Sequence, residues 1–380
     1  MSIIFTKPTI AGNELRYLRE VLQAPLAHRH WAGDGPFTQK CSSLIEKRFS
    51  ALKVLLTPSG THALELASLL LNLQAGDEVV VPSYAFSSTV NSFMLTGARP
   101  VFVDVREDTL NIDEDLIAKN ISRRTRAIVP IHYAGVSCNM TKINAIAKAH
   151  RLEVVEDAAQ AVNARYNDKF LGTIGSMGVY SFHESKNYSC GEGGALVINR
   201  ARFMERAEIL REKGTNRSKF FRGEVDKYTW VDVGSSYLLS DLLAAILYAQ
   251  LEKLNTIQQR RRLLYRRYEK KLTPLAQDGK LRLPIIPQDC LTNYHIFYLL
   301  LPTEKQRNNL MKFLKGRGIL AVFHYLPLHL APMGRALGYK KGDLPITEDI
   351  SGRLLRIPLY PDLTTRAQDR VIRGIQNYFS

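Results

Sequence analysis

Short apolar runs alternate with stretches of helical periodicity through the first half of the chain. Runs bounded by glycine, proline and charged residues predict buried strands, whereas apolar side chains repeating every three or four positions predict helices. The strands are expected at Val54–Leu56, Glu78–Val81, Val101–Val105, Ala127–Ile131, Leu152–Val155 and Ala195–Ile198, with another ending at Ser181–Phe182. The helices are expected at Gly12–Val21, Thr38–Phe49 (capped by Thr38), Ala63–Leu73, Met140–His150 and Ala201–Arg211. Strands and helices in alternation are typical of an α/β domain.

A change of pattern near residue 250 predicts a second, smaller α/β domain. A strongly apolar helix is expected at Ser240–Leu254, followed by a basic one around Arg260–Lys271. Further on, strands are expected at His295–Leu301 and Ala321–His324, and helices at Lys305–Arg317 and Arg366–Phe379. Because 380 residues exceed the usual domain length of about 100–200, we divide the chain into residues 1–250 and 251–380.

The chain is basic, with 52 Lys and Arg against 36 Asp and Glu, a net charge of +16. Nucleic acid, an anionic membrane surface and an acidic small substrate are the three partners that such a charge favours. The basic residues are scattered, and the densest run, Gln258–Lys271, has the spacing of one helix face. No nucleic-acid-binding motif accompanies it. An acidic small substrate is therefore the preferred partner, and a nucleic-acid-binding regulator is the alternative from another class.

The cysteines and the apolar runs indicate the compartment. Cys41, Cys138, Cys190 and Cys290 show no CxxC spacing, so neither a zinc site nor a disulfide scaffold is predicted. No apolar run approaches the ~20 residues that span a bilayer, and the N-terminus lacks a signal-peptide pattern. A cytoplasmic protein without membrane insertion is expected.

The stretch from Val154 to Gly194 carries the strongest candidate chemistry. Asp157 lies at the carboxyl end of a predicted strand, and Lys186 lies in the loop after another. Ligands of open α/β sheets bind at this edge, where a carboxylate and an amine could hold pyridoxal 5′-phosphate (PLP). Lys186 would form the Schiff base, and Asp157 would pair with the protonated ring nitrogen. Taken singly, Asp157 could be a helix cap and Lys186 a solvated loop charge.

Two further stretches fit such a site. Ser59, Gly60 and Thr61 precede a predicted helix, whose N-terminal N–H groups can bind phosphate, although an ordinary cap is the alternative. Phe86 follows a strand and could stack on the cofactor ring, with Tyr84 as the second choice. A core position is the alternative for Phe86.

The runs PSGTHAL, EDAAQ, SFHESKN and GEGG resemble the DegT/DnrJ/EryC1/StrS family of PLP-dependent nucleotide-sugar aminotransferases, over essentially the whole chain. The resemblance implies PLP-dependent fold type I, with a large mixed-sheet domain, a smaller C-terminal α/β domain and a homodimer that shares its active sites. It implies that Lys186 and Asp157 are catalytic. The residues that it implies around the cofactor are Gly60, Thr61, Phe86, Gln160, Ser181 and Ser236.

One family motif departs from its usual pattern in this chain. The run Gly214–Tyr237 reaches the neighbouring subunit's site in the family, and most members carry G-x-N-x-R at its end, where this chain has Gly234–Leu238. Here Ser236 replaces the asparagine and Leu238 the arginine. The resemblance also makes Tyr84, His324 and His329 candidates for substrate contact, with an ordinary loop histidine as the alternative for the last two.

The runs Glu212–Tyr237 and Ala321–His329 resemble the branch of the family that serves enterobacterial common antigen synthesis. This narrower resemblance implies transfer of the amino group of L-glutamate to C4 of dTDP-4-dehydro-6-deoxy-D-glucose, giving dTDP-4-amino-4,6-dideoxy-D-galactose. The 4-amino-4,6-dideoxy-D-glucose epimer, or amination at C3 of a 3-keto sugar, is the alternative. Lys186 argues against the dehydratase branch, which has histidine at this position.

Overall fold

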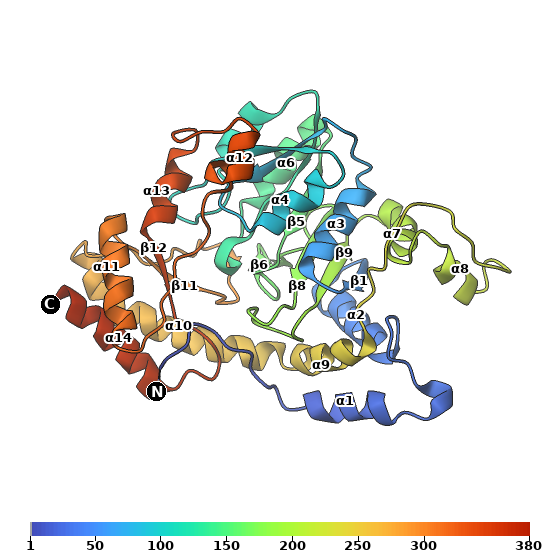
Figure 1. Ribbon diagram of the computed structural model, residues 1–380, viewed down its shortest axis with the longest axis horizontal. Coiled ribbons are helices and arrows are strands. Elements are labelled where there is room, and N and C mark those ends of the chain that lie inside the picture. The colour runs from blue at the N-terminus through green and yellow to red at the C-terminus, as the bar shows by residue number, and fades with distance from the viewer. Residues whose placement is uncertain (1) are drawn as a thin grey trace.

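The computed structural model describes residues 2–380, and a seven-stranded sheet of order β1-β9-β8-β5-β4-β2-β3 forms its centre (Figure 1). The strands are β1 (Lys53–Thr57), β2 (Glu78–Pro82), β3 (Arg99–Val103), β4 (Thr125–Ile128), β5 (Glu153–Asp157), β8 (Met177–Ser181) and β9 (Gly194–Ile198). All pairs are parallel except those that β9 makes with β1 and β8. The carboxyl ends of β2, β4, β5 and β8 therefore meet at one edge.

Helices cover both faces of this sheet, as its buried apolar strands require. One face carries α2 (Pro36–Phe49), α6 (Met140–His150) and α9 (Asp241–Glu252), and the other carries α3 (Gly60–Leu70), α4 (Ser87–Met94) and α7 (Met204–Arg211). Because successive strand residues point to opposite faces, Leu56 belongs to the first apolar cluster and Leu55 to the second. The result is a three-layer α/β/α core.

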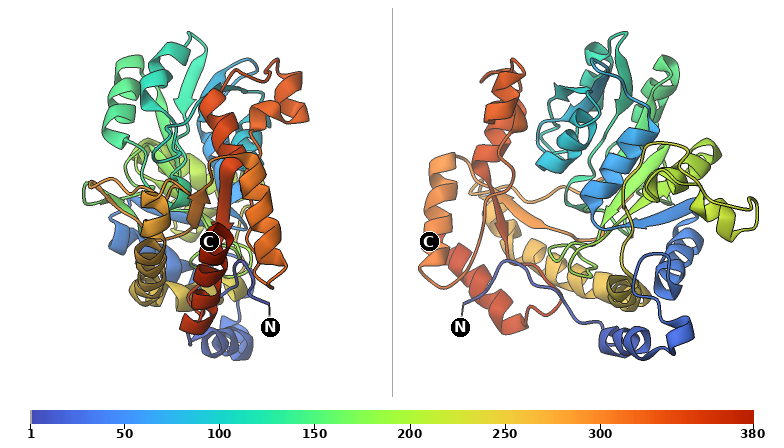
Figure 2. Two further views of the ribbon diagram at one scale, coloured as in Figure 1. Left: turned by 90° about the vertical axis from the view of Figure 1, so that its left-hand side faces the viewer. Right: turned by 45° about the vertical axis from the view of Figure 1, so that its right-hand side comes forward.

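The C-terminal part builds a separate apolar cluster around a two-stranded antiparallel sheet, β11 (Phe297–Leu300) with β12 (Leu354–Ile357). Helices α11 (Glu304–Lys315), α14 (Thr365–Phe379) and the 24-residue α10 (Leu254–Gln277) pack on it. Figure 2 shows β11, β12, α11 and α14 in a column beside the large sheet, whereas α10 continues from α9 along the lower side of the molecule. The division into residues 1–250 and 251–380 stays a prediction.

The remaining elements are short, apart from the first helix. They are α1 (Glu14–Gln23), α5 (Glu114–Ile117), α8 (Arg217–Phe221), α12 (Pro332–Ala336), α13 (Pro345–Arg353), and a small sheet of β6 (Arg165–Tyr166), β7 (Lys169–Phe170) and β10 (Cys290–Leu291). None of the helices within residues 2–380 is long and apolar enough to cross a membrane.

The helix α2 is predicted correctly, but its cap is not Thr38. The helix begins at Pro36, and the Asp241 carboxylate, from the start of α9, accepts hydrogen bonds from the N–H groups of Phe37 (3.3 Å) and Thr38 (2.7 Å). Gly35 occupies the cap position, where a Cβ atom would lie 2.4 Å from Asp241 Cγ. A carboxylate from a distant segment therefore replaces the local cap.

The strand predicted at Ala321–His324 is also wrong. Val322 makes only an isolated bridge to Arg356. In a strand, successive side chains point to opposite faces, but Phe323, His324 and Tyr325 all line one cavity. The backbone is therefore not paired as a strand after Val322, and three consecutive side chains face the same cavity.

Candidate active site

A cavity of about 780 Å³ lies at the carboxyl edge of the large sheet, between it and the C-terminal cluster. The large sheet contributes residues after β5 and β8, and the C-terminal part contributes His295, Tyr325 and Arg356. Eight of the predicted site residues line this cavity: Gly60, Thr61, Phe86, Asp157, Gln160, Ser181, Lys186 and His324. Residues from five separate segments are thus brought to one space of ligand size.

Asp157 is the last residue of β5, and its carboxylate is fixed on two sides. Oδ2 accepts a 2.7 Å hydrogen bond from Thr89 Oγ1, and Oδ1 accepts one of 3.1 Å from the N–H of Ala159. The side chain is nearly buried but faces the cavity. An oriented carboxylate at this place can bind a ring N–H⁺.

Lys186 lies in the loop after β8, with its N–H donating to the carbonyl of His183 at 2.9 Å. Its amine makes no hydrogen bond and no ion pair with any of residues 2–380. Burial lowers the pKa of the Lys186 amine, and Arg356 lowers it further, while Asp157 opposes both. A neutral amine is nucleophilic, so the site favours covalent chemistry at Lys186.

This pKa can be tested without any cofactor. In cofactor-free protein at about pH 8, a small acylating reagent is expected to modify Lys186 faster than the exposed Lys169, because more of the Lys186 amine is neutral. In Asp157→Asn, the modification of Lys186 should be faster still than in the unsubstituted protein, since the carboxylate that stabilises the ammonium form is gone. Peptide mass spectrometry over a time course measures both rates, and a slower reaction at Lys186 would contradict the expectation.

The turn before α3 supplies a narrow cradle. Ser59 caps the helix by accepting from the N–H of His62 at 3.1 Å, so the ordinary cap predicted as the alternative does exist. Thr61 Oγ1 bonds Ser88 Oγ at 2.8 Å. The packing around the turn is close: a Cβ at Gly60 would make a tight 3.0 Å contact with Ser181 Cβ, and one at Gly194, on β9, would clash with the Ser59 carbonyl carbon at 2.3 Å. The start of α3 therefore opens onto the cavity beside Ser181.

Gln160 and Phe86 complete the walls near Asp157. The Gln160 side chain accepts from the N–H of Ala134 and donates to Tyr325 Oη, both at 2.8 Å, which fixes its amide orientation. Phe86 is 59% exposed although it is aromatic, because its ring stands at the cavity instead of in the core. The core alternative for Phe86 is thereby excluded.

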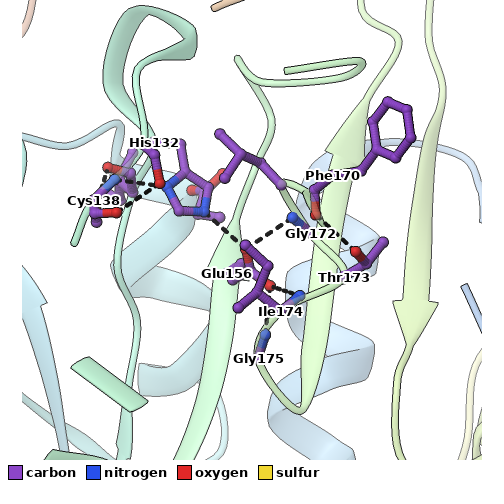
Figure 3. Close-up of polar contacts among 12 residues, drawn as sticks. His132, Cys138, Glu156, Phe170, Gly172, Thr173, Ile174 and Gly175 are labelled. Atoms are coloured by element: carbon purple, nitrogen blue, oxygen red, sulfur yellow. Dashed lines mark hydrogen bonds and ion pairs between the residues drawn. The ribbon is translucent and has the colours of Figure 1, made fainter. Parts of the chain in front are cut away.

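Behind Asp157, a buried network holds the end of β5 (Figure 3). The Glu156 carboxylate accepts from the N–H groups of Gly172 (2.8 Å), Ile174 and Gly175 (both 2.6 Å). His132 accepts the N–H of Cys138 at Nδ1, so its proton is on Nε2, which donates to Glu156 at 2.9 Å. Four donors therefore converge on this one carboxylate.

Glu156→Gln should be strongly destabilising, because the new amide group presents N–H to a set of N–H donors. We expect the free energy of unfolding to fall by about 3 kcal/mol, the cost of leaving one or two buried donors unpaired. Denaturant unfolding of the variant measures it. The matched control is Glu107→Gln at an exposed carboxylate, which should change stability by less than about 1 kcal/mol; equal losses would contradict a specific role for Glu156.

Three predicted residues do not reach the cavity. Tyr84 is only 1% exposed and packs among Tyr133 and Tyr325. His329 is fully buried, and its ring bonds Ser83 (2.7 Å) and Glu348 (3.1 Å). Ser236 lies on an exposed segment away from this cavity. The substrate contacts predicted for Tyr84 and His329 are therefore corrected to structural roles. Buried tyrosines surround the ring of Tyr84, and both ring nitrogens of His329 already have hydrogen-bond partners.

Several residues of the site are missing from the sequence-based prediction, among them Thr89, His295 and Arg356. Thr89, on α4, bonds Asp157, while His295 and Arg356 line the cavity from the C-terminal part. Burial, followed by the charge of Lys186, lowers the pKa of His295 well below its usual range. Arg356 sits in an apolar run, Leu354–Ile357, that predicts only a strand, so no local signal marks it.

Comparisons with known proteins agree with this architecture. The uncharacterized protein MJ1066 of Methanocaldococcus jannaschii is 33% identical over 381 residues, covering 98% of this chain and 97% of the relative. The aminotransferase TlmJ of Streptoalloteichus hindustanus superposes with a TM-score of 0.90 at 29% identity, covering 100% and 99%. The PLP form of the putative sugar aminotransferase Spr1654 of Streptococcus pneumoniae shares the fold, with a TM-score of 0.90 at 23% identity, covering 99% and 98%.

A mixed α/β sheet with an unpaired lysine and a fixed carboxylate at its carboxyl edge defines a PLP-dependent aminotransferase of fold type I. Residues 8–376 match the DegT/DnrJ/EryC1/StrS aminotransferase family, and the chain belongs to that family. Aminotransferases of this family depend on PLP, so PLP is the cofactor. The prediction of family, fold and cofactor from the sequence is confirmed.

Proposed function

We propose that this protein is a sugar aminotransferase that moves the amino group of L-glutamate to C4 of dTDP-4-dehydro-6-deoxy-D-glucose, giving dTDP-4-amino-4,6-dideoxy-D-galactose. One observation carries the proposal: Lys186, with a lowered pKa, and Asp157 face the same cavity. The choice of sugar rests on the resemblance of Glu212–Tyr237 and Ala321–His329 to one branch of the family. The runners-up are the D-gluco epimer and a 3-keto sugar.

The residues of the cavity fit PLP. Lys186 would hold it covalently, and Asp157 would bind its ring N–H⁺. Gly60, Thr61 and Ser181 would bind the phosphate at the start of α3. Phe86 and Gln160 would hold the ring and its phenolic oxygen. When bound, the cofactor supplies an electron sink for the carbon next to the transferred nitrogen.

The chain's own groups then handle the proton. The Lys186 amine is expected to take a proton from the carbon that carries the nitrogen in the donor and to return it at the carbon on the other side of that nitrogen, which is a 1,3-shift. Its lowered pKa keeps part of the amine in the neutral, basic form. Asp157 would keep the ring nitrogen protonated, and the hydrogen bonds from Thr89 and Ala159 hold its carboxylate in place for that role.

The assembly and location belong to the same proposal. A homodimer is expected, in which Ser236 reaches the neighbouring subunit's cofactor phosphate. The exposed aromatic side chains Phe221 and Trp230, on the same segment, suit burial in such an interface. The cytoplasm, where nucleotide sugars and L-glutamate are available, is the expected compartment.

A product assay tests the proposal. PLP-loaded protein is mixed with L-glutamate and dTDP-4-dehydro-6-deoxy-D-glucose, and the sugar product is analysed by proton NMR. A small H3–H4 coupling identifies the axial amine of the galacto product. A large coupling would replace it with the gluco epimer, and no amination would direct the search to 3-keto sugars. A gel-shift titration without specific binding at moderate salt removes the nucleic-acid alternative.

A further inference from the structure

His295 presents to the catalytic cavity a ring nitrogen that no other group of the protein uses. The residue lies two positions before β11 and lines the cavity together with Asp157 and Lys186. Its Nδ1 is 2.9 Å from Asn187 Oδ1, whereas Nε2 makes no hydrogen bond with any of residues 2–380 and is not fully buried. Nε2 is therefore open to a ligand.

The amide beside the ring assigns the proton of His295. Asn187, the neighbour of Lys186, donates through Nδ2 to the Asn293 carbonyl at 2.9 Å, so its Oδ1 faces His295. An amide oxygen only accepts, hence His295 carries its proton on Nδ1 and a lone pair on Nε2. Burial, followed by the charge of Lys186, lowers the pKa of His295 well below its usual range, so the ring stays neutral. Through Nε2, His295 offers the cavity an acceptor and not a donor.

The backbone around His295 is held in a conformation that costs free energy. Tyr294 has a φ of 57°, in the left-handed region that bulky side chains rarely adopt. The buried Arg261, on α10, fixes both carbonyls: Nε donates to that of Tyr294 (3.0 Å) and Nη2 to that of His295 (2.6 Å). Strain of this kind persists only where the surroundings enforce it, and it gathers at functional sites. The fold thus holds the His295 ring at a set position beside the cavity.

We propose that Nε2 of His295 accepts a hydrogen bond from the hydroxyl of the keto sugar that is next to the carbon being aminated. This inference rests on the proposed function. L-Glutamate brings carboxylates, which only accept hydrogen bonds, and its amine has to meet the cofactor. A sugar ring brings hydroxyl donors, which a fixed lone pair can bind.

The position of His295 selects the hydroxyl. Its Nδ1 is tied to Asn187, the residue that follows Lys186, and Lys186 has to reach the carbon that is aminated. The sugar hydroxyl nearest to Nε2 is then the one beside that carbon. In dTDP-4-dehydro-6-deoxy-D-glucose, this is the hydroxyl at C3.

The two half-reactions separate the sugar from the amino-acid donor. His295→Asn keeps an N–H near the position of Nδ1 for Asn187 but removes Nε2. For protein preloaded with pyridoxamine phosphate, kcat/KM for the keto sugar should fall about 30-fold, because the hydroxyl loses its acceptor. The half-reaction with L-glutamate should stay within about twofold. His295→Gln, whose longer side chain can bring an amide oxygen near the position of Nε2, should recover most of the loss. Absorbance changes of the cofactor follow each half-reaction in a single turnover.

An analogue of the keto sugar without the C3 hydroxyl tests the contact itself. The unsubstituted protein and His295→Asn should aminate this analogue with kcat/KM values within about twofold of each other, because the group that His295 binds is missing. The double comparison isolates the pairwise contact. A loss of about 30-fold that persists with the analogue would overturn the proposal.

Binding without turnover gives a further readout. The probe is dTDP-6-deoxy-D-glucose, which has no keto group and cannot be aminated, titrated by calorimetry into the PLP-loaded protein. It should bind His295→Asn about tenfold more weakly than the unsubstituted protein. The matched control is His150→Asn, at an exposed histidine that ends α6, which should leave binding unchanged. Thermal unfolding of both variants establishes that they fold.

The remaining outcomes overturn the proposal in distinct ways. Equal losses in both half-reactions would assign His295 to Lys186 or to the fold, and a loss confined to L-glutamate would assign it to the amino-acid donor. Unchanged kinetics and binding in His295→Asn would leave Nε2 without a ligand. If the unsubstituted protein reacts with L-glutamate but not with this keto sugar, the proposed sugar fails. His295 is then tested with the keto sugar that is aminated and with its analogue lacking the neighbouring hydroxyl.

Discussion

Lys186→Ala is expected to abolish transamination, with a loss of at least about 10⁴-fold in the half-reaction with L-glutamate. Two functions would disappear together, because the same amine is proposed as both the covalent attachment point and the proton carrier. No other lysine lines the cavity, so no neighbour can replace it within residues 2–380. Single-turnover absorbance with L-glutamate, followed by mass analysis of 2-oxoglutarate, measures the residual rate.

The matched control for this prediction is Lys169→Ala. Lys169 is exposed on β7 and lies outside the cavity, so the substitution removes the same charge without touching the site. Its activity should stay within about twofold of the unsubstituted protein. Substantial turnover by Lys186→Ala would show that this lysine is not the attachment point, and the cofactor arrangement proposed above would have to be abandoned.

Asp157→Asn should leave a protein that binds PLP but reacts with L-glutamate at least about 10³-fold more slowly. Asparagine has the shape of aspartate and can keep contacts with Thr89 and Ala159, so the site should stay assembled. What it lacks is the negative charge that keeps the ring nitrogen protonated. The rate of the half-reaction and the pH dependence of the bound cofactor's absorption report this change.

Thr89→Val separates charge from orientation. It removes the 2.7 Å hydrogen bond to Asp157 but leaves the carboxylate, so we expect a loss of only about tenfold. A normal half-reaction in Asp157→Asn would refute the role given to Asp157. A Thr89→Val loss as large as that of Asp157→Asn would mean that orientation, and not charge, controls the reaction.

Some of this site could be predicted because the signals are local. Asp157 follows an apolar run, Lys186 precedes a cluster of glycines, and Gly60 opens a helix. In each case the neighbouring residues are enough to indicate the position of the residue in the fold. A parallel sheet then brings the ends of separate strands to one edge without further information. The helix Met140–His150 is predicted with its observed bounds for the same reason, since its period and its cap, Asn139, are local.

The rest depends on partners that are distant in sequence. Tyr84 and His329 are residue types that often contact ligands. Tertiary packing surrounds Tyr84 with buried tyrosines and places Ser83 against His329, and the sequence does not show this. Arg356 is marked only by what the fold places around it, namely Phe5, Phe323 and a cavity without a counter-ion. Thr38 was predicted as a cap because the competing carboxylate, Asp241, lies 203 positions further along the chain.

That carboxylate also bears on how the molecule is made. Asp241 satisfies the first N–H groups of α2, and β1 finds its only partner, among the described residues, in β9. During synthesis, the segment that forms α2 and β1 therefore lacks these partners until the ribosome has delivered more than half of the chain. Until β9 is available, the apolar β1 segment has no strand to pair with. An unpaired apolar segment is prone to aggregation, so chaperone binding is expected to matter most at this stage of synthesis.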